Sequence, residues 1–122
     1  MSHFRECMVE LKALDEEVAK EAMAELASHL GDSVTTVVAD YFGRPARVVA
    51  GLERLGYGVT VSDGGVKVLG DPYGKKVSIE EFRDRFVQMY TVAAMRRVLR
   101  KAGFNVSKTI SGKNIVLTGV RV

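Results

Sequence analysis

Basic side chains are concentrated in the second half of this chain, where they could bind phosphates or other anions. Four of them lie close together near the end of a predicted helix: Arg96, Arg97, Arg100 and Lys101. Two more, Lys75 and Lys76, precede the start of that helix. Arginine and lysine neutralise backbone phosphates, and a basic stripe on a helix is typical of nucleic-acid-binding proteins. The same cations could instead complement the carboxyl end of the helix dipole, or pair with an acidic helix of the same chain or of a second copy.

A second candidate site is the loop 71–74, with the sequence Asp-Pro-Tyr-Gly, which follows a predicted strand. Binding and catalytic residues often lie on loops that a rigid scaffold positions. Asp71 and Tyr73 are the residues of this loop that could contact a small ligand. Because Asp-Pro-Tyr-Gly is also an ordinary turn sequence, the sequence leaves both interpretations open.

The residues that most often carry catalysis or bind metals are scarce. Cys7 is the single cysteine and lies on the apolar side of a predicted strand, where a thiol usually behaves as a small hydrophobic group. His29 falls in the last turn of a predicted helix, and His3 lies near the start of the sequence. One cysteine and two histidines cannot by themselves complete a tetrahedral zinc site. We therefore assign no catalytic residue, no metal ligand and no cofactor.

The first of two predicted helices covers about 15–30. Asp15 is suited to the N-cap position and Gly31 to the end of the helix. Its apolar residues lie along one stripe: Val18, Ala22, Leu26 and Leu30. We expect its glutamates to form a solvated face: Glu16, Glu17, Glu21 and Glu25.

The second predicted helix, about 79–102, is the best-defined element. Ser78 and Glu81 have the spacing of a capping box at its start. Gly103 is suited to the left-handed position after its end. The apolar stripe changes direction along the helix, so its two halves should face different neighbours.

The remaining segments are predicted to be strands. We expect them at 4–11, 34–39, 46–52, 104–110 and 114–120, with a hairpin formed by 58–61 and 66–69. The segment 46–52 also fits a helix, but Gly51 favours a strand. The element order is then β-α-β-β-β-β-α-β-β, with strands clustered between and after the helices. This order predicts an α+β fold, a mainly antiparallel sheet packed with two helices, in a single domain covering 1–122. The place of the first strand in the sheet stays open.

Length and composition are those of one ordinary globular domain: 122 residues, 47% hydrophobic and 27% charged. The sequence contains no apolar run of about 20 residues and no signal peptide at its start, so we expect a soluble, cytoplasmic protein with no membrane partner. The net charge of +3 is unevenly distributed, because eight basic residues and no acidic ones follow Asp84. Only three residues are Asn or Gln, a depletion typical of heat-adapted proteins.

Several short motifs resemble a family of conserved hypothetical proteins encoded in red-algal plastids, in cyanobacteria and in other prokaryotes. The motifs are the opening Met-Ser-His-Phe, the stretch Val-Lys-Val-Leu-Gly-Asp-Pro-Tyr-Gly at 66–74, Ile-Glu-Glu-Phe at 79–82, Gln-Met-Tyr at 88–90 and Gly-Phe-Asn-Val at 103–106. Met89 departs from the family, which tends to have arginine there, and the family's tryptophans are lacking. The resemblance implies the same α+β order and no particular activity.

Three functional hypotheses remain open. The favoured one is a non-catalytic module that acts by protein association, with itself or with a partner, through an acidic first helix and a basic second helix. The first alternative is binding of nucleic acid or another polyanion by the basic residues. The second alternative is a small-ligand site or an enzyme active site at the loop 71–74.

Overall fold

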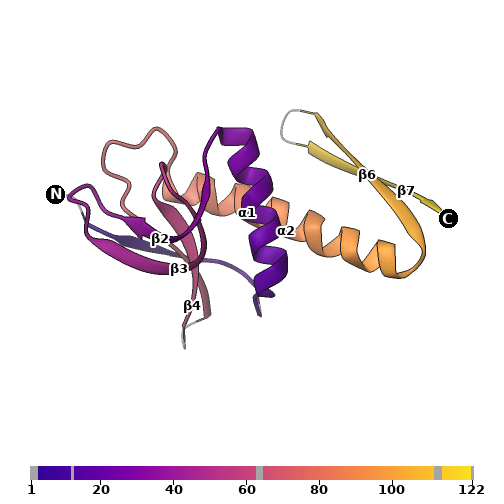
Figure 1. Ribbon diagram of the computed structural model, residues 1–122, viewed down its shortest axis with the longest axis horizontal. Coiled ribbons are helices and arrows are strands. Elements are labelled where there is room, and N and C mark those ends of the chain that lie inside the picture. Colours follow the sequence, from indigo (N-terminus) through magenta and orange to yellow (C-terminus); the bar gives the residue numbers. More distant parts are fainter. Residues whose placement is uncertain (1–2, 12, 63–64, 112–113, 122) are drawn as a thin grey trace.

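The computed structural model describes residues 3–11, 13–62, 65–111 and 114–121, and its elements follow the predicted order (Figure 1). They are β1 (Arg5–Met8), α1 (Glu16–Leu30), β2 (Val34–Ala39), β3 (Pro45–Leu52), β4 (Tyr57–Ser62), β5 (Gly65–Gly70), α2 (Ile79–Lys101), β6 (Phe104–Ser111) and β7 (Asn114–Arg121). Strands β1 to β5 form one antiparallel sheet, and β6 and β7 form a second sheet of two strands. The predicted α+β class is confirmed.

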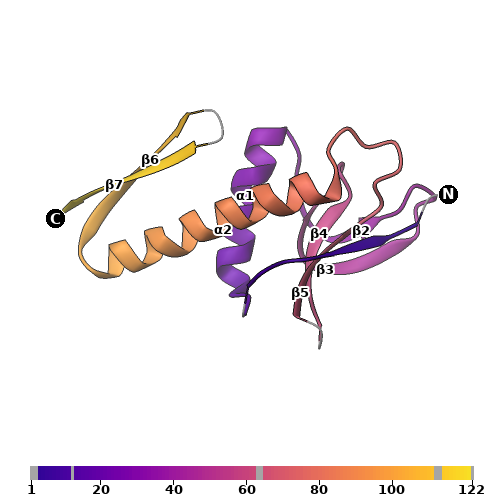
Figure 2. The same cartoon turned by 180° about the vertical axis from the view of Figure 1, so that it is seen from behind.

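The five-stranded sheet has the order β1-β5-β4-β3-β2, which places the first strand beside β5. Arg5 lies opposite Gly70 in this pairing, and the strand is shorter than the predicted 4–11. After Met8 the chain turns away from regular pairing, although the N–H of Val9 still donates to the carbonyl oxygen of Val66 at 2.9 Å. The start of the chain therefore lies at the same end of the sheet as the loop that follows β5 (Figure 2).

The ambiguous segment 46–52 is part of strand β3, as predicted. Gly51 is buried there and faces Gly58 of β4 across the sheet. A Cβ added to Gly51 would lie 2.8 Å from the carbonyl oxygen of Tyr57, and one added to Gly58 would lie 2.6 Å from the side chain of Val48. The glycines therefore allow a close approach between two strands, which a helix at this position would not require.

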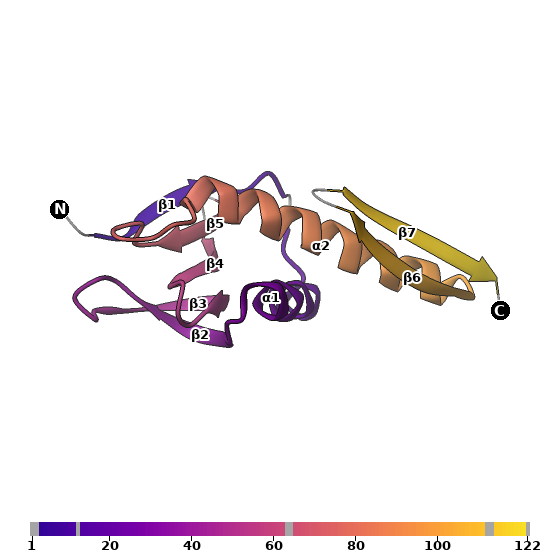
Figure 3. The same ribbon diagram turned by 90° about the horizontal axis from the view of Figure 1, so that it is seen from above.

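Both helices pack on the five-stranded sheet, α1 mainly on β3 and the first half of α2 on β5 and β1 (Figure 3). The predicted cap of α1 is confirmed, because the carboxylate of Asp15 accepts hydrogen bonds from the N–H groups of Glu17 and Val18. Gly31 ends the helix with a φ of 64°. The core between helices and sheet includes Met23, Leu26, Leu52, Val59, Val68, Phe82 and Phe86.

Helix α2 extends well beyond the sheet. Its start is capped by the Ser78 hydroxyl, which accepts a hydrogen bond from the N–H of Glu81 at 3.0 Å. The helix ends at Lys101, one residue earlier than predicted, and Gly103 follows with a φ of 89°. Ile79, Phe82 and Phe86 of its first half are fully buried, whereas Ala93 is the only buried residue after them. The two halves thus have different surroundings, as the shift of the apolar stripe predicts.

The C-terminal hairpin packs on the second half of α2 and lies apart from the five-stranded sheet (Figures 1 and 3). We call the second half of α2, from Val92, together with β6 and β7 the arm. A hairpin of two strands is marginally stable in water by itself. Its stability must therefore come from packing on α2 or on another surface.

Candidate functional site

The basic residues of α2 are partly used within the chain. Arg96 donates to Glu21 at 3.4 Å and to Glu25 at 3.0 Å, and Arg97 donates to Glu21 at 3.1 Å. The Arg96 side chain is only 13% exposed. The prediction of a fully solvated glutamate face is therefore wrong for Glu21 and Glu25, whose side chains are half-buried in ion pairs between α1 and α2. Glu16 and Glu17 are exposed.

The six basic candidate residues do not form one patch. Lys75 and Lys76 precede α2, whereas Arg100 and Lys101 lie at its other end, a separation of about 35 Å for a 23-residue helix. Lys75 donates to the carbonyl oxygen of Arg54 at 3.3 Å, and Lys76 is exposed. Arg100 and Lys101 are exposed and line an open groove of about 740 Å³ between the two helices, together with Arg97 and Glu21. Glu21 in this groove already takes up the charge of Arg97, so Arg100 and Lys101 are the cations of the groove for which no ion pair with a described carboxylate is recorded.

The loop 71–74 is anchored by a buried carboxylate. Asp71 is 2% exposed and accepts hydrogen bonds from the N–H of Tyr41 at 2.8 Å and from the N–H of Tyr73 at 3.0 Å. Asp71 therefore fixes two loops relative to each other. The side chain of Tyr73, in contrast, is 52% exposed.

Tyr73 belongs to a group of exposed rings that the sequence alone did not bring together. The β2–β3 turn contributes Tyr41 and Phe42, whose side chains are 62% and 68% exposed. The Tyr41 ring centroid lies 4.7 Å from that of Tyr73 and 5.4 Å from that of Phe42, both in edge-to-face geometry. We call Tyr41, Phe42 and Tyr73 the aromatic cluster. The signal for it in the sequence was a pair of adjacent aromatic residues between the predicted strands 34–39 and 46–52.

A second buried carboxylate shapes the β2–β3 turn. Asp40 accepts hydrogen bonds from the N–H groups of Phe42 at 2.9 Å and Arg44 at 2.8 Å, and from the guanidinium group of Arg44. Burial alone would raise the pKa of Asp40, but these bonds from Arg44 and Phe42 outweigh it and lower the pKa from its ordinary value. Arg44 also lies over the ring of Phe42, 5.7 Å from its centroid. The turn therefore holds its exposed rings in a defined position.

A hollow of about 210 Å³ opens beside Tyr73 and is lined also by His3, Arg5, Asp71 and Pro72. The segment between β5 and α2 is also held by Tyr57, which is fully buried and donates a hydrogen bond from its hydroxyl to the carbonyl oxygen of Val77 at 2.7 Å. Gly70 makes room for that ring, because a Cβ added there would lie 2.1 Å from Cδ1 of Tyr57.

The residues considered for catalysis do not assemble. The Cys7 thiol is half-buried, and its sulfur accepts a hydrogen bond from the Arg83 guanidinium at 2.9 Å. His29 is exposed in the last turn of α1. Within the part of the chain that the structure describes, no group of three or more His, Cys, Asp or Glu side chains is placed to hold a metal ion.

The two sheets differ in how their edges are protected. In the five-stranded sheet, β1 has only four residues, two of which are the charged Arg5 and Glu6, and β2 has a register shift between Thr35 and Val37. Short strands, charges and bulges are the usual means of preventing edge-to-edge pairing. In the second sheet, β6 and β7 pair without a register shift over all eight residues of each strand.

The arm also exposes apolar side chains. They are Met95 and Val98 on α2 and Val116 and Val120 on β7, each at least 50% exposed. Val116 and Val120 lie on the same face of β7, four residues apart. The charged residues of the two strands are Lys108 in β6 and Arg121 at the end of β7. The arm thus combines an apolar surface with a long, almost uncharged strand edge.

Comparison of this chain with protein-family models, with curated proteins and with solved structures finds no significant match. The resemblance to the plastid and cyanobacterial family therefore stays a prediction. Among the described residues, no helix is both long and apolar enough to cross a membrane.

Proposed function

We propose that this protein acts by association, and that its arm joins it to a second copy of the same chain through the free edge of β7. The observation that carries the proposal is the unprotected edge of an eight-residue strand with exposed Val116 and Val120. An exposed, regular and hydrophobic strand edge pairs readily with another strand. A second copy of the chain supplies an identical edge, and a two-fold axis makes such a contact self-complementary.

An antiparallel arrangement around Thr118 suits both the apolar residues and the charges of β7. It places Val116 of one copy opposite Val120 of the other, so that the exposed valines pack side by side as cross-strand pairs on one face of a four-stranded sheet. The Arg121 residues then lie at opposite ends of the shared edge. Cross-strand apolar pairs contribute roughly 0.2–1 kcal/mol each, in addition to the backbone hydrogen bonds between the edges.

The charge of the arm gives this association a characteristic salt dependence. Seven basic and no acidic residues follow Val92 in the sequence, so two arms that approach each other are both positive. Salt screens repulsion between like charges, and the dimer should therefore become tighter as the salt concentration rises. If an acidic α1 face of one copy instead bound a basic α2 face of another, added salt would screen the attraction and weaken the dimer. Arg96 and Arg97 already pair with glutamates of α1 inside one chain, so fewer charged groups of α1 and α2 are free to pair between two copies.

Light scattering after size exclusion, over a series of protein concentrations at low and at high salt, tests the proposal. We expect a dimer whose dissociation constant falls with added salt. The double variant Val116→Lys/Val120→Lys places lysines opposite each other in the proposed register, and it should be monomeric. Val61→Lys is the matched control, because Val61 lies on β4 of the other sheet and has the same exposure, 54%, as Val116.

A change of charge sign tests the register itself. Val116→Lys/Val120→Glu places opposite charges across the two-fold axis, so this variant should dimerise more tightly than Val116→Lys/Val120→Lys. A wild-type chain that stays monomeric at every concentration and salt would refute self-association. A dimer that is unaffected by both double variants would refute the assignment to β7.

A further inference from the structure

We propose that the aromatic cluster, formed by Tyr41, Phe42 and Tyr73, is a binding site for the bases of single-stranded nucleic acid. This site lies on the five-stranded sheet, at the end where β2 and β5 finish, and is separate from the arm. It goes beyond self-association and would operate in a monomer or in a dimer. It also differs from a polyanion site on α2, because base stacking rather than phosphate contact would carry recognition.

The cluster is held in place by the polypeptide before any ligand binds. Asp71 accepts hydrogen bonds from the backbone N–H groups of both Tyr41 and Tyr73, and so connects the β2–β3 turn to the loop after β5. Asp40 accepts bonds from two further N–H groups of the turn. Burying carboxylates is costly unless they are fully hydrogen-bonded. Two of them are used here to position rings that are themselves exposed, and a site positioned in advance binds at a lower entropic cost.

The geometry of the rings leaves aromatic faces available for stacking. Tyr41 lies between Phe42 and Tyr73, with interplanar angles of 86° and 72°. In an edge-to-face contact the edge of one ring lies against one face of its partner, so each of the two contacts occupies a single ring face, and Arg44 lies over one face of Phe42. The remaining ring faces are not covered within the cluster. All three side chains are more than half exposed. Nucleobases stack on such rings irrespective of sequence, which is how proteins bind single strands without base-specific hydrogen bonds.

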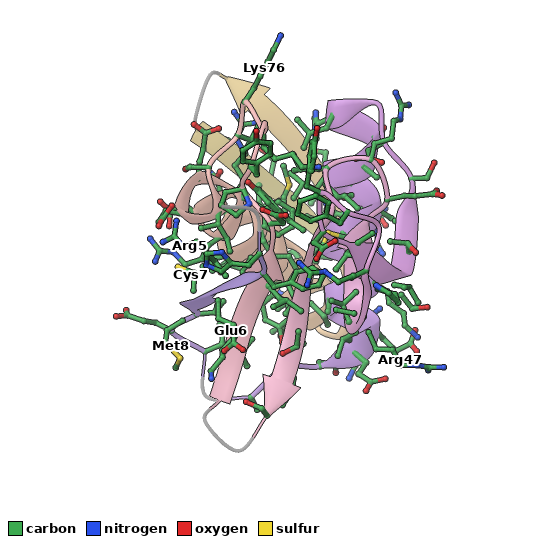
Figure 4. All side chains as sticks on the ribbon, turned by 90° about the vertical axis from the view of Figure 1, so that its left-hand side faces the viewer. Arg5, Glu6, Cys7, Met8, Arg47 and Lys76 are labelled. Carbon is green, nitrogen blue, oxygen red and sulfur yellow. The ribbon has the colours of Figure 1, made fainter. Side chains whose placement is uncertain are left out.

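Exposed basic side chains border the rings, which favours a nucleic-acid strand over an apolar protein segment. Arg44 lies over Phe42, Arg5 lines the hollow beside Tyr73, and Lys76 extends into solvent from the loop that follows Tyr73 (Figure 4). Arg44 is paired with Asp40 and Arg5 with Glu80, but both basic side chains stay at least half exposed, whereas the carboxylates of the two loops, Asp40 and Asp71, are buried. Exposed rings with adjacent cations are the combination that binds bases and phosphates together.

Fluorescence anisotropy with a labelled oligothymidylate tests the site, with an abasic oligonucleotide of the same length as the second probe. We expect the oligothymidylate to bind and the abasic strand to bind at least tenfold more weakly. Phe42→Leu and Tyr73→Leu keep an apolar side chain but remove an aromatic face, and each should weaken binding by about fivefold or more. Because both side chains are exposed, these variants should unfold at the wild-type temperature, which circular dichroism checks.

Salt dependence and a charge control separate this site from the basic end of α2. With Arg5, Arg44 and Lys76 as the only phosphate contacts, the slope of log affinity against log salt should be no steeper than about −2. Arg100→Gln/Lys101→Gln should leave the affinity unchanged. The proposal is overturned if the oligothymidylate does not bind. It is equally overturned if the abasic strand binds as tightly as the oligothymidylate. It is also overturned if Arg100→Gln/Lys101→Gln lowers the affinity while Phe42→Leu and Tyr73→Leu do not.

Discussion

Replacing Arg96 by methionine tests whether the basic cluster of α2 serves the fold. The guanidinium group of Arg96 joins Glu21 and Glu25 of α1, and its side chain is 13% exposed. Methionine keeps an apolar side chain of similar length but removes the charge and all donors. We therefore expect Arg96→Met to destabilise the packing of α1 on α2 while it preserves most of the apolar contact.

The expected magnitude follows from the burial of the three partners. Exposed ion pairs contribute about 0–1 kcal/mol, whereas removing one partner of a buried pair costs about 3–5 kcal/mol. The glutamate side chains are 26% and 24% exposed, which places this network between the two cases. We expect a loss of about 1.5–3 kcal/mol in the free energy of unfolding. For a chain of 122 residues this corresponds to a fall in Tm of roughly 6–12 °C.

Urea unfolding followed by circular dichroism measures this loss, and Arg85→Met is the matched control. Arg85 lies on the same helix, but its contact with Glu81 is 3.9 Å long and both side chains are about half exposed. The control should cost less than about 0.5 kcal/mol. If Arg96→Met costs no more than Arg85→Met, the ion pairs do not hold the helices together and the structural explanation of the cluster fails.

Two hydrogen-bonded side chains make the stability depend on pH at both extremes. Burial would raise the pKa of Asp32, but hydrogen bonds from the N–H groups of Arg54 and Leu55 outweigh it and lower the pKa from 3.8. At low pH the folded state then binds fewer protons than the unfolded chain, so the free energy of unfolding should fall as the pH drops below about 4. The fall should be smaller in the variant Asp32→Asn, which itself lowers the free energy of unfolding by about 1–2 kcal/mol at neutral pH. Burial, and then the charges of nearby carboxylates, raise the pKa of Tyr57 above 10.0. The free energy of unfolding should therefore fall as the pH rises past about 10. The fall should be smaller in the variant Tyr57→Phe, which loses the hydrogen bond to Val77 and about 1 kcal/mol of stability at neutral pH. Urea titrations at a series of pH values measure the acid and the alkaline dependence.

The local elements of the fold could be predicted because their signals are local. The Asp15 and Ser78 caps and the glycines at 31 and 103 each act within a few residues, and the structure places all four as expected. The hairpin of β4 and β5 has alternating valines on both sides of a glycine-rich turn, and its pairing matches. Residues 63 and 64 of this turn lie outside the described residues.

The spatial arrangement could not be predicted, because it depends on contacts between residues far apart in the sequence. Tyr41 and Asp71 are 30 positions apart, and nothing in either segment indicates that the carboxylate of one accepts the N–H of the other. The same holds for Glu21 and Arg96, whose ion pair shows that part of the basic cluster is neutralised within the chain. The sequence named Asp71 and Tyr73 as ligand-loop candidates, but only the fold separates the buried anchor from the exposed ring.

The length of α2 explains why the arm keeps apolar side chains exposed. A helix of 23 residues is about 35 Å long, whereas α1, with 15 residues, covers about 22 Å. The sheet and α1 bury the first half of α2, and the overhanging half keeps Met95 and Val98 exposed even though the hairpin packs on it. Because no acidic residue follows Asp84, the arm cannot neutralise its own charge, and Arg96 and Arg97 rely on α1 for that. The strand edge of β7 is not paired with another strand among the described residues of the same chain, and in the proposed dimer a second copy would supply that pairing.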